Sequence, residues 1–194
     1  MILSDRQIQE NSTMISPMLD GLKRDVFSNG APIPAISYGV SSYGYDIRLS
    51  PEEFWIFKHV PGTVVDPKNF DQGNLERAEL HSDRNGEFFI IPAHSYGLGV
   101  SIERFQMPPT VTAICMGKST YARTGIIVNI TPLEAGWRGY LTLEISNASS
   151  ADCRVYANEG IAQLLFLEGE PCTTSYADRK GKYNDQVGVT LARM

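Results

Sequence analysis

Cysteines and long apolar runs are both scarce in this sequence. Its 194 residues include three cysteines, Cys115, Cys153 and Cys172, and no CxxC pair. An odd and widely spaced set argues against a disulfide framework and favours reduced thiols in a cytoplasm. No stretch approaches the length of a membrane-spanning helix, and residues 1–6 lack the apolar core of a signal peptide. We therefore expect a cytoplasmic protein with no membrane partner.

Positive charge is also in short supply. The chain has 17 Lys and Arg against 22 Asp and Glu, which gives a formal net charge of -5. A general nucleic-acid surface needs a basic patch or stripe, so we expect no nucleic-acid partner. A nucleotide stays compatible with this composition, because a few local cations are enough to hold its phosphates.

Signatures of a protein-bound metal are missing as well. None of the three histidines, His59, His81 and His94, lies at metal-ligand spacing from another. The zinc nucleobase deaminases carry H-x-E and P-C-x-x-C, whereas here Ser95-Tyr96 follow His94 and Pro171-Cys172 lack a second cysteine. A structural zinc would also need more suitably spaced ligands. We therefore predict no metal site and no zinc.

The sequence also disfavours two further enzyme classes, the P-loop ATPases and the hydrolases with a nucleophilic triad. Residues 117–120 read GKST, but residue 112 is Thr where a Walker A motif needs its upstream glycine. A strand–loop–helix ATPase is therefore not expected. Ser119 has no evident His and Asp partners, so a nucleophilic triad is not expected either.

Short β-strand patterns fill most of the chain. Ser4 and Gln7 predict a capping box for a short N-terminal helix that ends near Glu10, and residues 20–23 predict another helical turn. Runs rich in Val, Ile, Tyr and Phe, separated by Gly, Pro, Asn and Asp, predict the strands. The predicted strands are 44–49, 53–58, 87–91, 96–102, 111–116, 126–130, 140–146, 153–156, 161–167 and 187–191. This pattern predicts one all-β domain over residues 1–194, with a mobile loop at 66–84.

Two segments carry the clearest chemical signal. Residues 117–123 (GKSTYAR) gather a glycine, two cations and two short hydroxyl side chains, a turn suited to a phosphate-rich ligand. In residues 141–146, aliphatic side chains alternate with Thr142, Glu144 and Ser146, so the carboxylate is predicted on the polar face of a strand. Taken singly, Lys118, Arg123 and Glu144 are more readily explained as solvated side chains. Together they suggest nucleotide binding and proton transfer.

The polar, basic segment 176–186 admits two interpretations. It is either a fraying terminus or a lid that closes over phosphates. Residues 187–191 (VGVTL) would anchor its far end as a strand, which favours the lid.

Four stretches in this order resemble the dCTP deaminase family. They are SSYGYDIRL at 41–49, GKSTYARTGIIVNITPLEAGWRGYLTLEISN at 117–147, YANEGIAQLLF at 156–166 and SYADRKGKY at 175–183. The resemblance extends over nearly the whole chain. It implies a branch of the dUTPase superfamily, with distorted β-barrel, jelly-roll-like subunits that form a homotrimer and active sites at the subunit interfaces.

The resemblance also implies roles for individual residues. Glu144 takes the place of the catalytic acid/base, and Ser119 and Arg123 those that order the attacking water and support the reacting base. Lys118, Ser119 and Thr120 lie where the family holds the triphosphate, and Glu134 is a candidate for the sugar contact. The remaining expected substrate contacts are Tyr121, Ala122, Arg123, Thr142, Leu143, Gln163, Tyr176, Lys182 and Gln186.

The activity that this resemblance implies is hydrolytic deamination of dCTP to dUTP and ammonia. Such a reaction needs an activated water, a proton on N3 and a proton for the departing ammonia, and one carboxylate of raised pKa can carry these protons. Magnesium would arrive with the triphosphate, and dTTP is an implied feedback inhibitor. The alternatives are a dUTPase, a bifunctional enzyme that also releases diphosphate, and a nucleotide-binding sensor. A diphosphatase would need a second carboxylate near the phosphates, for which Glu134 and Asp178 are the nearest candidates.

Overall fold

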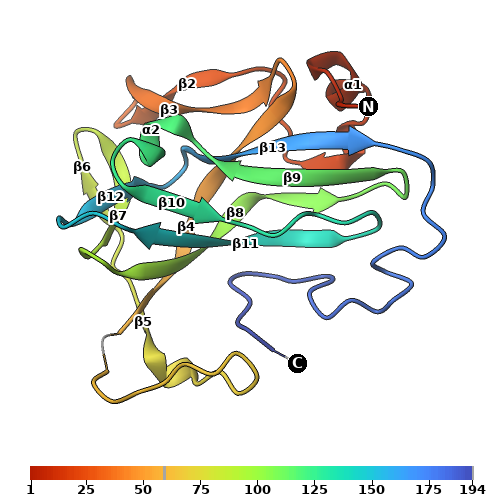
Figure 1. The fold of residues 1–194 in the computed structure, drawn as a ribbon. Helices are drawn as coiled ribbons and strands as arrows, with labels where there is room; N and C mark the ends of the chain where they lie inside the picture. The colour runs from red at the N-terminus through yellow and green to blue at the C-terminus, as the bar shows by residue number, and fades with distance from the viewer. Residues whose placement is uncertain (59, 194) are drawn as a thin grey trace.

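Antiparallel strands dominate the fold, which a computed structural model describes for residues 1–58 and 60–193 (Figure 1). The helical elements are α1 (Asp5–Glu10), α2 (Ser119–Ala122) and the 3-10 turns η1 (Ser12–Met14) and η2 (Gln72–Asn74). The strands are β1 (Ile15–Ser16), β2 (Lys23–Ser28), β3 (Ala31–Ser41), β4 (Gly44–Phe57), β5 (Leu75–Arg77), β6 (His81–Asp83), β7 (Gly86–Ile91), β8 (Tyr96–Gln106), β9 (Val111–Gly117), β10 (Ile126–Asn129), β11 (Arg138–Asn147), β12 (Cys153–Tyr156) and β13 (Gly160–Glu168).

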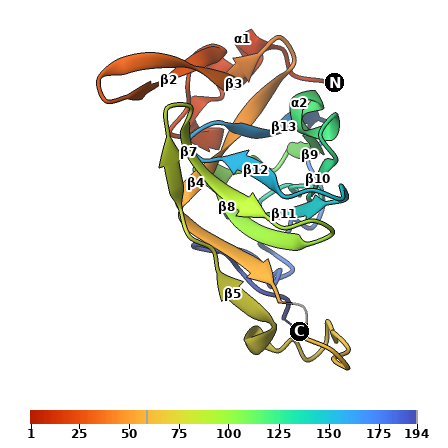
Figure 2. The ribbon, with the colours of Figure 1, turned by 90° about the vertical axis from the view of Figure 1, so that its left-hand side faces the viewer.

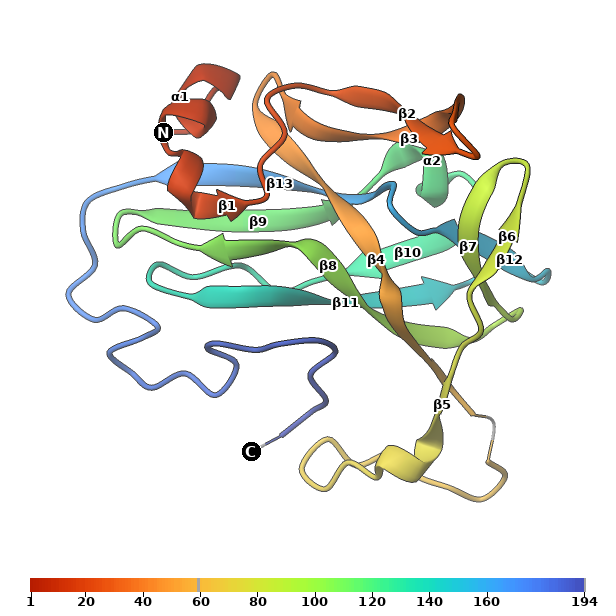
Figure 3. The ribbon, with the colours of Figure 1, turned by 180° about the vertical axis from the view of Figure 1, so that it is seen from behind.

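The long strand β4 organises the larger sheet. Within the described residues this sheet has ten strands in the order β10-β11-β8-β4-β13-β9, with β1, β2, β3 and β5 attached beside that path. The first half of β4 pairs with β3 and β13, and its second half pairs with β8 and β5. The partner changes after Arg48, which pairs with β13, and a register shift then interrupts the β8 pairing between Leu49 and Phe54. β4 thereby connects the β9–β13 side of the sheet with the β8–β11 side (Figure 3).

A smaller sheet, ordered β12-β7-β6, packs against the larger one. The rings of Phe54 on β4 and Phe89 on β7 stack with their centroids 4.9 Å apart, which joins the two layers at the core. The all-β, jelly-roll-like prediction is therefore confirmed, with a short N-terminal helix in front of it. Across the part of the chain described, the sheets stay open and no barrel closes.

The sequence patterns found most strands but not all boundaries. The predicted strands 44–49 and 53–58 are one continuous strand, β4, because the polar residues between them stay extended. The capping box of α1 forms as predicted between Ser4 and Gln7, and Ile8 fixes the helix to the core. The predicted helical turn at 20–23 is wrong, since Lys23 begins β2.

Two other expectations need correction. The predicted strand 187–191 does not form, and Val187 is 81% exposed. The segment 66–84, predicted as a mobile loop, contains η2, β5 and β6. β5 gains order by pairing with the end of β4, so the polar composition hid a short strand.

The hairpin β2–β3 was not predicted. It turns at Asn29 and Gly30, whose φ angles of 50° and 80° are those of a two-residue hairpin turn. Pro32 and Pro34 lie in β3, a composition that usually argues against a strand interior. In Figure 2 the hairpin extends beyond the central strands of the larger sheet, and Pro32 and Pro34 pair there with β2 alone, a position in which a strand tolerates proline.

The C-terminal segment, residues 169–193, runs back across the molecule after β13. It passes alongside β11 in both the front and the rear view (Figures 1 and 3). A parallel bridge joins Gly139 to Gln186. No helix among residues 1–58 and 60–193 has the length and apolar character needed to cross a membrane.

Candidate active site

A cavity of about 720 Å³ lies between β11 and the C-terminal segment. One wall comes from β11 and the loop before it, and includes Thr142, Glu144 and Trp137. Aromatic side chains from β4 and β8, Phe57 and Tyr96, form another wall. The third wall is the C-terminal segment, from which Tyr176, Lys182, Tyr183, Gln186, Thr190 and Ala192 line the cavity.

Glu144 is the carboxylate of this cavity. It stands on β11 between Asn129 of β10 and Leu98 of β8, so two neighbouring strands fix its backbone. Its Oε2 atom is buried and has no hydrogen-bond partner among the described residues. Burial raises the pKa of Glu144 to about 7, against a smaller opposing effect of its own backbone N–H. A carboxyl group of this kind can both accept and return a proton near neutral pH.

Two neighbours of Glu144 stay protonated. Burial, with a further contribution from Glu144, raises the pKa of Tyr96 and that of Cys115 to about 12 each. Neither group therefore competes with Glu144 for the proton at neutral pH. Leu143, the next residue on β11, is fully buried on the opposite face, so only its backbone can reach a ligand.

The C-terminal segment is held over the cavity by contacts with its own chain. Arg138 binds Asp185 through two hydrogen bonds, of 2.5 and 2.8 Å. The Gln186 Nε2 atom donates to the Tyr140 carbonyl at 2.6 Å, and the Thr190 N–H donates to the Thr142 hydroxyl at 3.0 Å. Of the predicted substrate contacts, Tyr176, Lys182, Gln186 and Thr142 are thus brought together with Glu144.

The predicted phosphate turn lies elsewhere in the chain. α2 follows β9 next to the β2–β3 hairpin, away from the C-terminal segment (Figure 1). None of the described residues 118–123 lines the Glu144 cavity. Ser119, Thr120, Ala122 and Arg123 are exposed, and the Arg123 guanidinium donates to the Ser119 carbonyl at 2.9 Å.

Tyr121 anchors this turn instead of facing solvent. It is buried, and its hydroxyl accepts the Tyr156 N–H at 2.8 Å. Burial raises the pKa of Tyr121 above its usual range. Only the backbone of Tyr121 is therefore left for a ligand, whereas the exposed hydroxyls of Ser119 and Thr120 are free to reach one.

Beneath the turn lies a polar cluster that the sequence patterns did not single out. The Lys118 ammonium donates to Asp46 Oδ2 at 2.5 Å and to the Ser37 hydroxyl at 3.1 Å. Gln163 stands opposite Asp46 on β13, so two predicted substrate residues meet at one buried carboxylate. Asp46 lies within the stretch SSYGYDIRL between Tyr45 and Ile47, and a carboxylate flanked by two large apolar side chains was the available signal.

The carboxylates considered for a second activated water are already engaged. Glu134 pairs with Arg179 of the C-terminal segment. Asp178 accepts from the backbone and the hydroxyl of Ser175, at 2.9 and 2.7 Å.

The described residues hold no group of three or more potential metal ligands. His81 stacks on Phe88 with 5.6 Å between ring centroids, and His94 lies in a turn with a φ of 55°. His59 lies outside the described residues.

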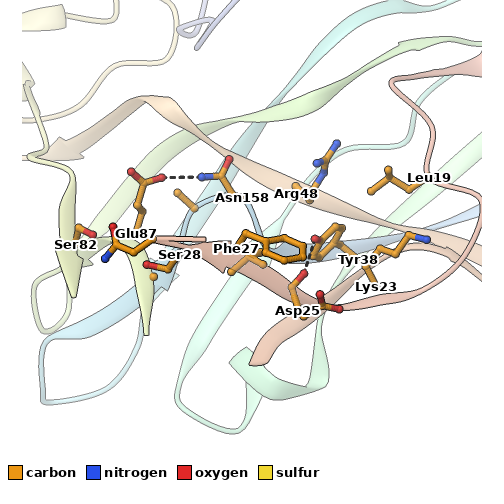
Figure 4. Close-up of a pocket in the computed structure, with 14 residues that line it drawn as sticks. Leu19, Lys23, Asp25, Phe27, Ser28, Tyr38, Arg48, Ser82, Glu87 and Asn158 are labelled. Carbon is orange, nitrogen blue, oxygen red and sulfur yellow. Dashed lines mark hydrogen bonds between the residues drawn. The ribbon is translucent and has the colours of Figure 1, made fainter. Parts of the chain in front are cut away.

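A second cavity, of about 610 Å³, separates the β2–β3 hairpin from β7 (Figure 4). Two cations line it, Lys23 and Arg48, of which Arg48 is bound to Glu103 at 2.7 Å and lies over the ring of Tyr38. Asp25 and Glu87 also line it, so no single charge prevails there. This balance gives the cavity no evident preference for an ionic ligand.

Comparisons with known proteins agree on one family. A family model described as dCTP deaminase-like matches residues 22–169. A dCTP deaminase of Campylobacter fetus subsp. fetus is 52% identical over 192 residues, which cover 98% of this chain and 97% of that protein. A dCTP deaminase of Sulfurovum sp. is 49% identical over 194 residues, which cover 98% and 95%.

The fold has a counterpart among solved structures. The crystal structure of 2'-deoxycytidine 5'-triphosphate deaminase from Agrobacterium tumefaciens matches with a TM-score of 0.53 at 18% identity. The match covers 87% of this chain and 48% of that chain, so the present chain spans about half of that longer protein. At this identity the match supports the fold alone.

Proposed function

Because this chain belongs to the dCTP deaminase-like family, we propose that it deaminates dCTP hydrolytically to dUTP and ammonia. Water adds to C4 of the cytosine as it loses a proton to Glu144, and Glu144 passes that proton to N3. Glu144 next takes the proton of the new C4 hydroxyl and gives it to the amino group, so that the C4–N4 bond breaks, ammonia leaves and the C4 carbonyl of dUTP forms. Glu144 therefore has to change protonation state in each turnover.

The observation that carries the proposal is the state of Glu144. Its buried Oε2 atom lacks a partner within the described chain, and its pKa is raised to about 7 by burial. A surface carboxylate would stay ionised at neutral pH and return a proton poorly. Here the cavity supplies the desolvation that the chemistry requires.

We propose that the complete site forms between subunits of a homotrimer. Glu144 lies in one cavity, whereas α2 of the same chain does not line that cavity in the described structure. A second copy would bring Ser119 and Arg123 to the reacting base and the hydroxyls of α2 to the triphosphate.

An apolar strip on the sheet supports this assembly. Ile114 and Met116 on β9 and Ile127 on β10 are 43%, 45% and 55% exposed. They lie on two strands that contact each other, so a monomer would leave a joined apolar surface in water. A second copy of the chain covers such a strip and brings α2 with it.

The engaged carboxylates favour deamination without diphosphate release. Glu134 is paired with Arg179 and Asp178 with Ser175, so neither is free to activate a water at the α-phosphorus. Glu144 serves C4, several ångströms from that phosphorus. We therefore propose dUTP as the released product.

Magnesium enters in this proposal as part of the substrate, held mostly by phosphate oxygens and water, and zinc takes no part. The reaction would take place in a cytoplasm, as the free thiols of Cys115, Cys153 and Cys172 suggest. Inhibition by dTTP would follow from its shared triphosphate and deoxyribose.

The test is a time course with dCTP in which every nucleotide product is resolved. We expect ammonia and dUTP to rise together while diphosphate stays flat, with added dUTP unchanged. Diphosphate in step with ammonia would assign the chain to the bifunctional class. Binding of dCTP without any turnover would leave only a sensor.

A further inference from the structure

The ammonium of Lys118 is fixed from two sides by its own chain. It donates to Asp46 Oδ2 at 2.5 Å and to the Ser37 hydroxyl at 3.1 Å, which places β9, β4 and β3 around one cation. The Lys118 side chain is 11% exposed and that of Asp46 is 5% exposed. Held in this way, the lysine loses the freedom that a surface lysine keeps.

Asp46 can accept a hydrogen bond in addition to this ion pair. Its Oδ1 atom is buried and accepts no hydrogen bond among the residues described. Gln163 stands directly opposite on β13, and its amide nitrogen donates to the Ser41 hydroxyl at 3.3 Å. Asp46 thus lies between two residues that the nucleotide is expected to contact, Lys118 before α2 and Gln163 on β13.

The backbone makes room for this arrangement. A Cβ atom on Gly160 would overlap the carbonyl oxygen of Ser37 and lie 3.2 Å from Cδ of Lys118. A glycine at the start of β13 therefore lets β3 and the lysine stem come close together. Lys118 immediately precedes α2, so fixing its side chain also fixes the exposed hydroxyls of Ser119 and Thr120.

We infer that Asp46 is a positioning residue, which holds Lys118 and the start of α2 in place for the triphosphate. The inference rests on the proposed function, because it assumes that this turn holds the phosphates of dCTP. Asp46 acts through Lys118 and does not touch the reacting base. Its loss should therefore weaken phosphate binding more than it slows the chemical step.

The test compares the wild type with Asp46→Asn, which keeps the shape and removes the charge. We expect the KM for dCTP and the Kd for inorganic tripolyphosphate, measured by calorimetry, both to rise roughly ten-fold or more, with a smaller fall in kcat. Ser37→Ala should shift both constants in the same direction by less, and serves if Asp46→Asn does not fold. Unchanged tripolyphosphate affinity in a folded Asp46→Asn or Ser37→Ala protein overturns the inference.

A matched control separates positioning from stability. Glu103→Gln removes the charge of the other buried carboxylate of an ion pair, that with Arg48, and should lower the melting temperature without changing tripolyphosphate affinity. In a Lys118→Met background, Asp46→Asn should leave the KM unchanged and raise stability, because it removes an unpaired buried charge. An equal KM penalty in both backgrounds contradicts action through Lys118. Absence of dCTP turnover by the wild type would instead reject the proposed function, while the tripolyphosphate measurement still decides the role of Asp46.

Discussion

The two halves of the proposed site are built in opposite ways. Around Glu144 the chain closes on itself, so that the carboxyl loses water and its pKa rises to about 7. Around α2 the chain is open, with Ser119 and Thr120 exposed above a buried ion pair. Proton transfer gains from a desolvated carboxyl group, whereas phosphate binding needs accessible donors on a fixed support. One chain builds both halves but keeps them apart, which is why we place the complete site between copies.

Removal of the proton acceptor should have the largest effect on activity. Glu144→Gln keeps the shape of the side chain and cannot take a proton, so kcat should fall by about 10⁴-fold or more while dCTP binding survives. Glu159→Gln is the matched control, because burial also raises the pKa of Glu159 to about 7 and that residue does not line the Glu144 cavity. We expect Glu159→Gln to keep most of the activity. Near-wild-type turnover by Glu144→Gln would reject the assignment.

Mixing two inactive chains tests whether the halves come from different copies. A Glu144→Gln chain keeps its α2 half, and an Arg123→Ala chain keeps its Glu144 half. In randomly mixed trimers about a quarter of the sites combine two intact halves, so activity should return to roughly that fraction. Mixing has to be verified, for instance with tagged chains. Verified mixed trimers that stay inactive would show that both residues serve one site from one chain.

The pH dependence of catalysis should follow the protonation state of Glu144. Glu144 accepts a proton only as a carboxylate, and its pKa is raised to about 7 by burial. We therefore expect kcat/KM to fall about ten-fold per pH unit below that value, in a full pH–rate profile of dCTP deamination. A profile that stays flat down to pH 5 would mean that Glu144 does not act as the base.

Stability should depend on pH in the opposite sense to activity. The pKa of Glu144 is about 7 in the folded chain against an ordinary value of 4.5. The folded state therefore binds this proton more readily than the unfolded state, and the resulting stabilisation, present below pH 4.5, is lost as the pH rises to 7. Glu144→Gln should thus be more stable than the wild type at pH 8, by on the order of 2 kcal/mol, with little difference at pH 4. Denaturant unfolding at both pH values measures this. A Glu144→Gln protein that is less stable than the wild type at pH 8 would show that the buried carboxylate does not lower the free energy of unfolding.

The sequence could predict those features that depend on neighbouring residues alone. The alternation around Glu144 depends only on the local period of a strand, and β11 keeps it from Leu143 to Ser146, whereas Thr142 is buried beside a register shift. The capping box at Ser4 and Gln7 is equally local. The hairpin β2–β3 was not predicted, although Asn29-Gly30 is a hairpin turn signal, and the prolines of β3 are unusual in a strand.

Long-range contacts were beyond the sequence patterns. Glu144 is buried in a cavity whose wall includes Lys182 and Gln186, about forty residues further along the chain. The pairing of Lys118 with Asp46 spans a sequence separation of 72 residues. The predicted strand 187–191 failed for a related reason: side chains and not a strand partner hold those residues.

The smallest expected effect concerns the far end of the C-terminal segment. Glu53 on β4 accepts the Val189 N–H at 2.8 Å with one carboxyl oxygen and the Trp55 Nε1–H at 2.7 Å with the other. Glu53→Ala removes the acceptor that ties residue 189 to the sheet, but Asp185 and Gln186 keep their own contacts with β11. We therefore expect only a partial loosening of the cavity wall, with a rise of about three-fold in the KM for dCTP and faster proteolysis between residues 176 and 193.

Glu52→Ala is the matched control for this change, because Glu52 is the adjacent, exposed glutamate and its side chain takes no part in holding the segment. Equal proteolysis rates in the two variants would mean that the contacts of Asp185 and Gln186 alone keep the C-terminal segment closed. Faster proteolysis confined to Glu53→Ala would show that β4 stabilises the closed half of the site from its outer edge. The open half around α2 should then keep its tripolyphosphate affinity, because none of the hydrogen bonds of Glu53 within the described residues reaches it.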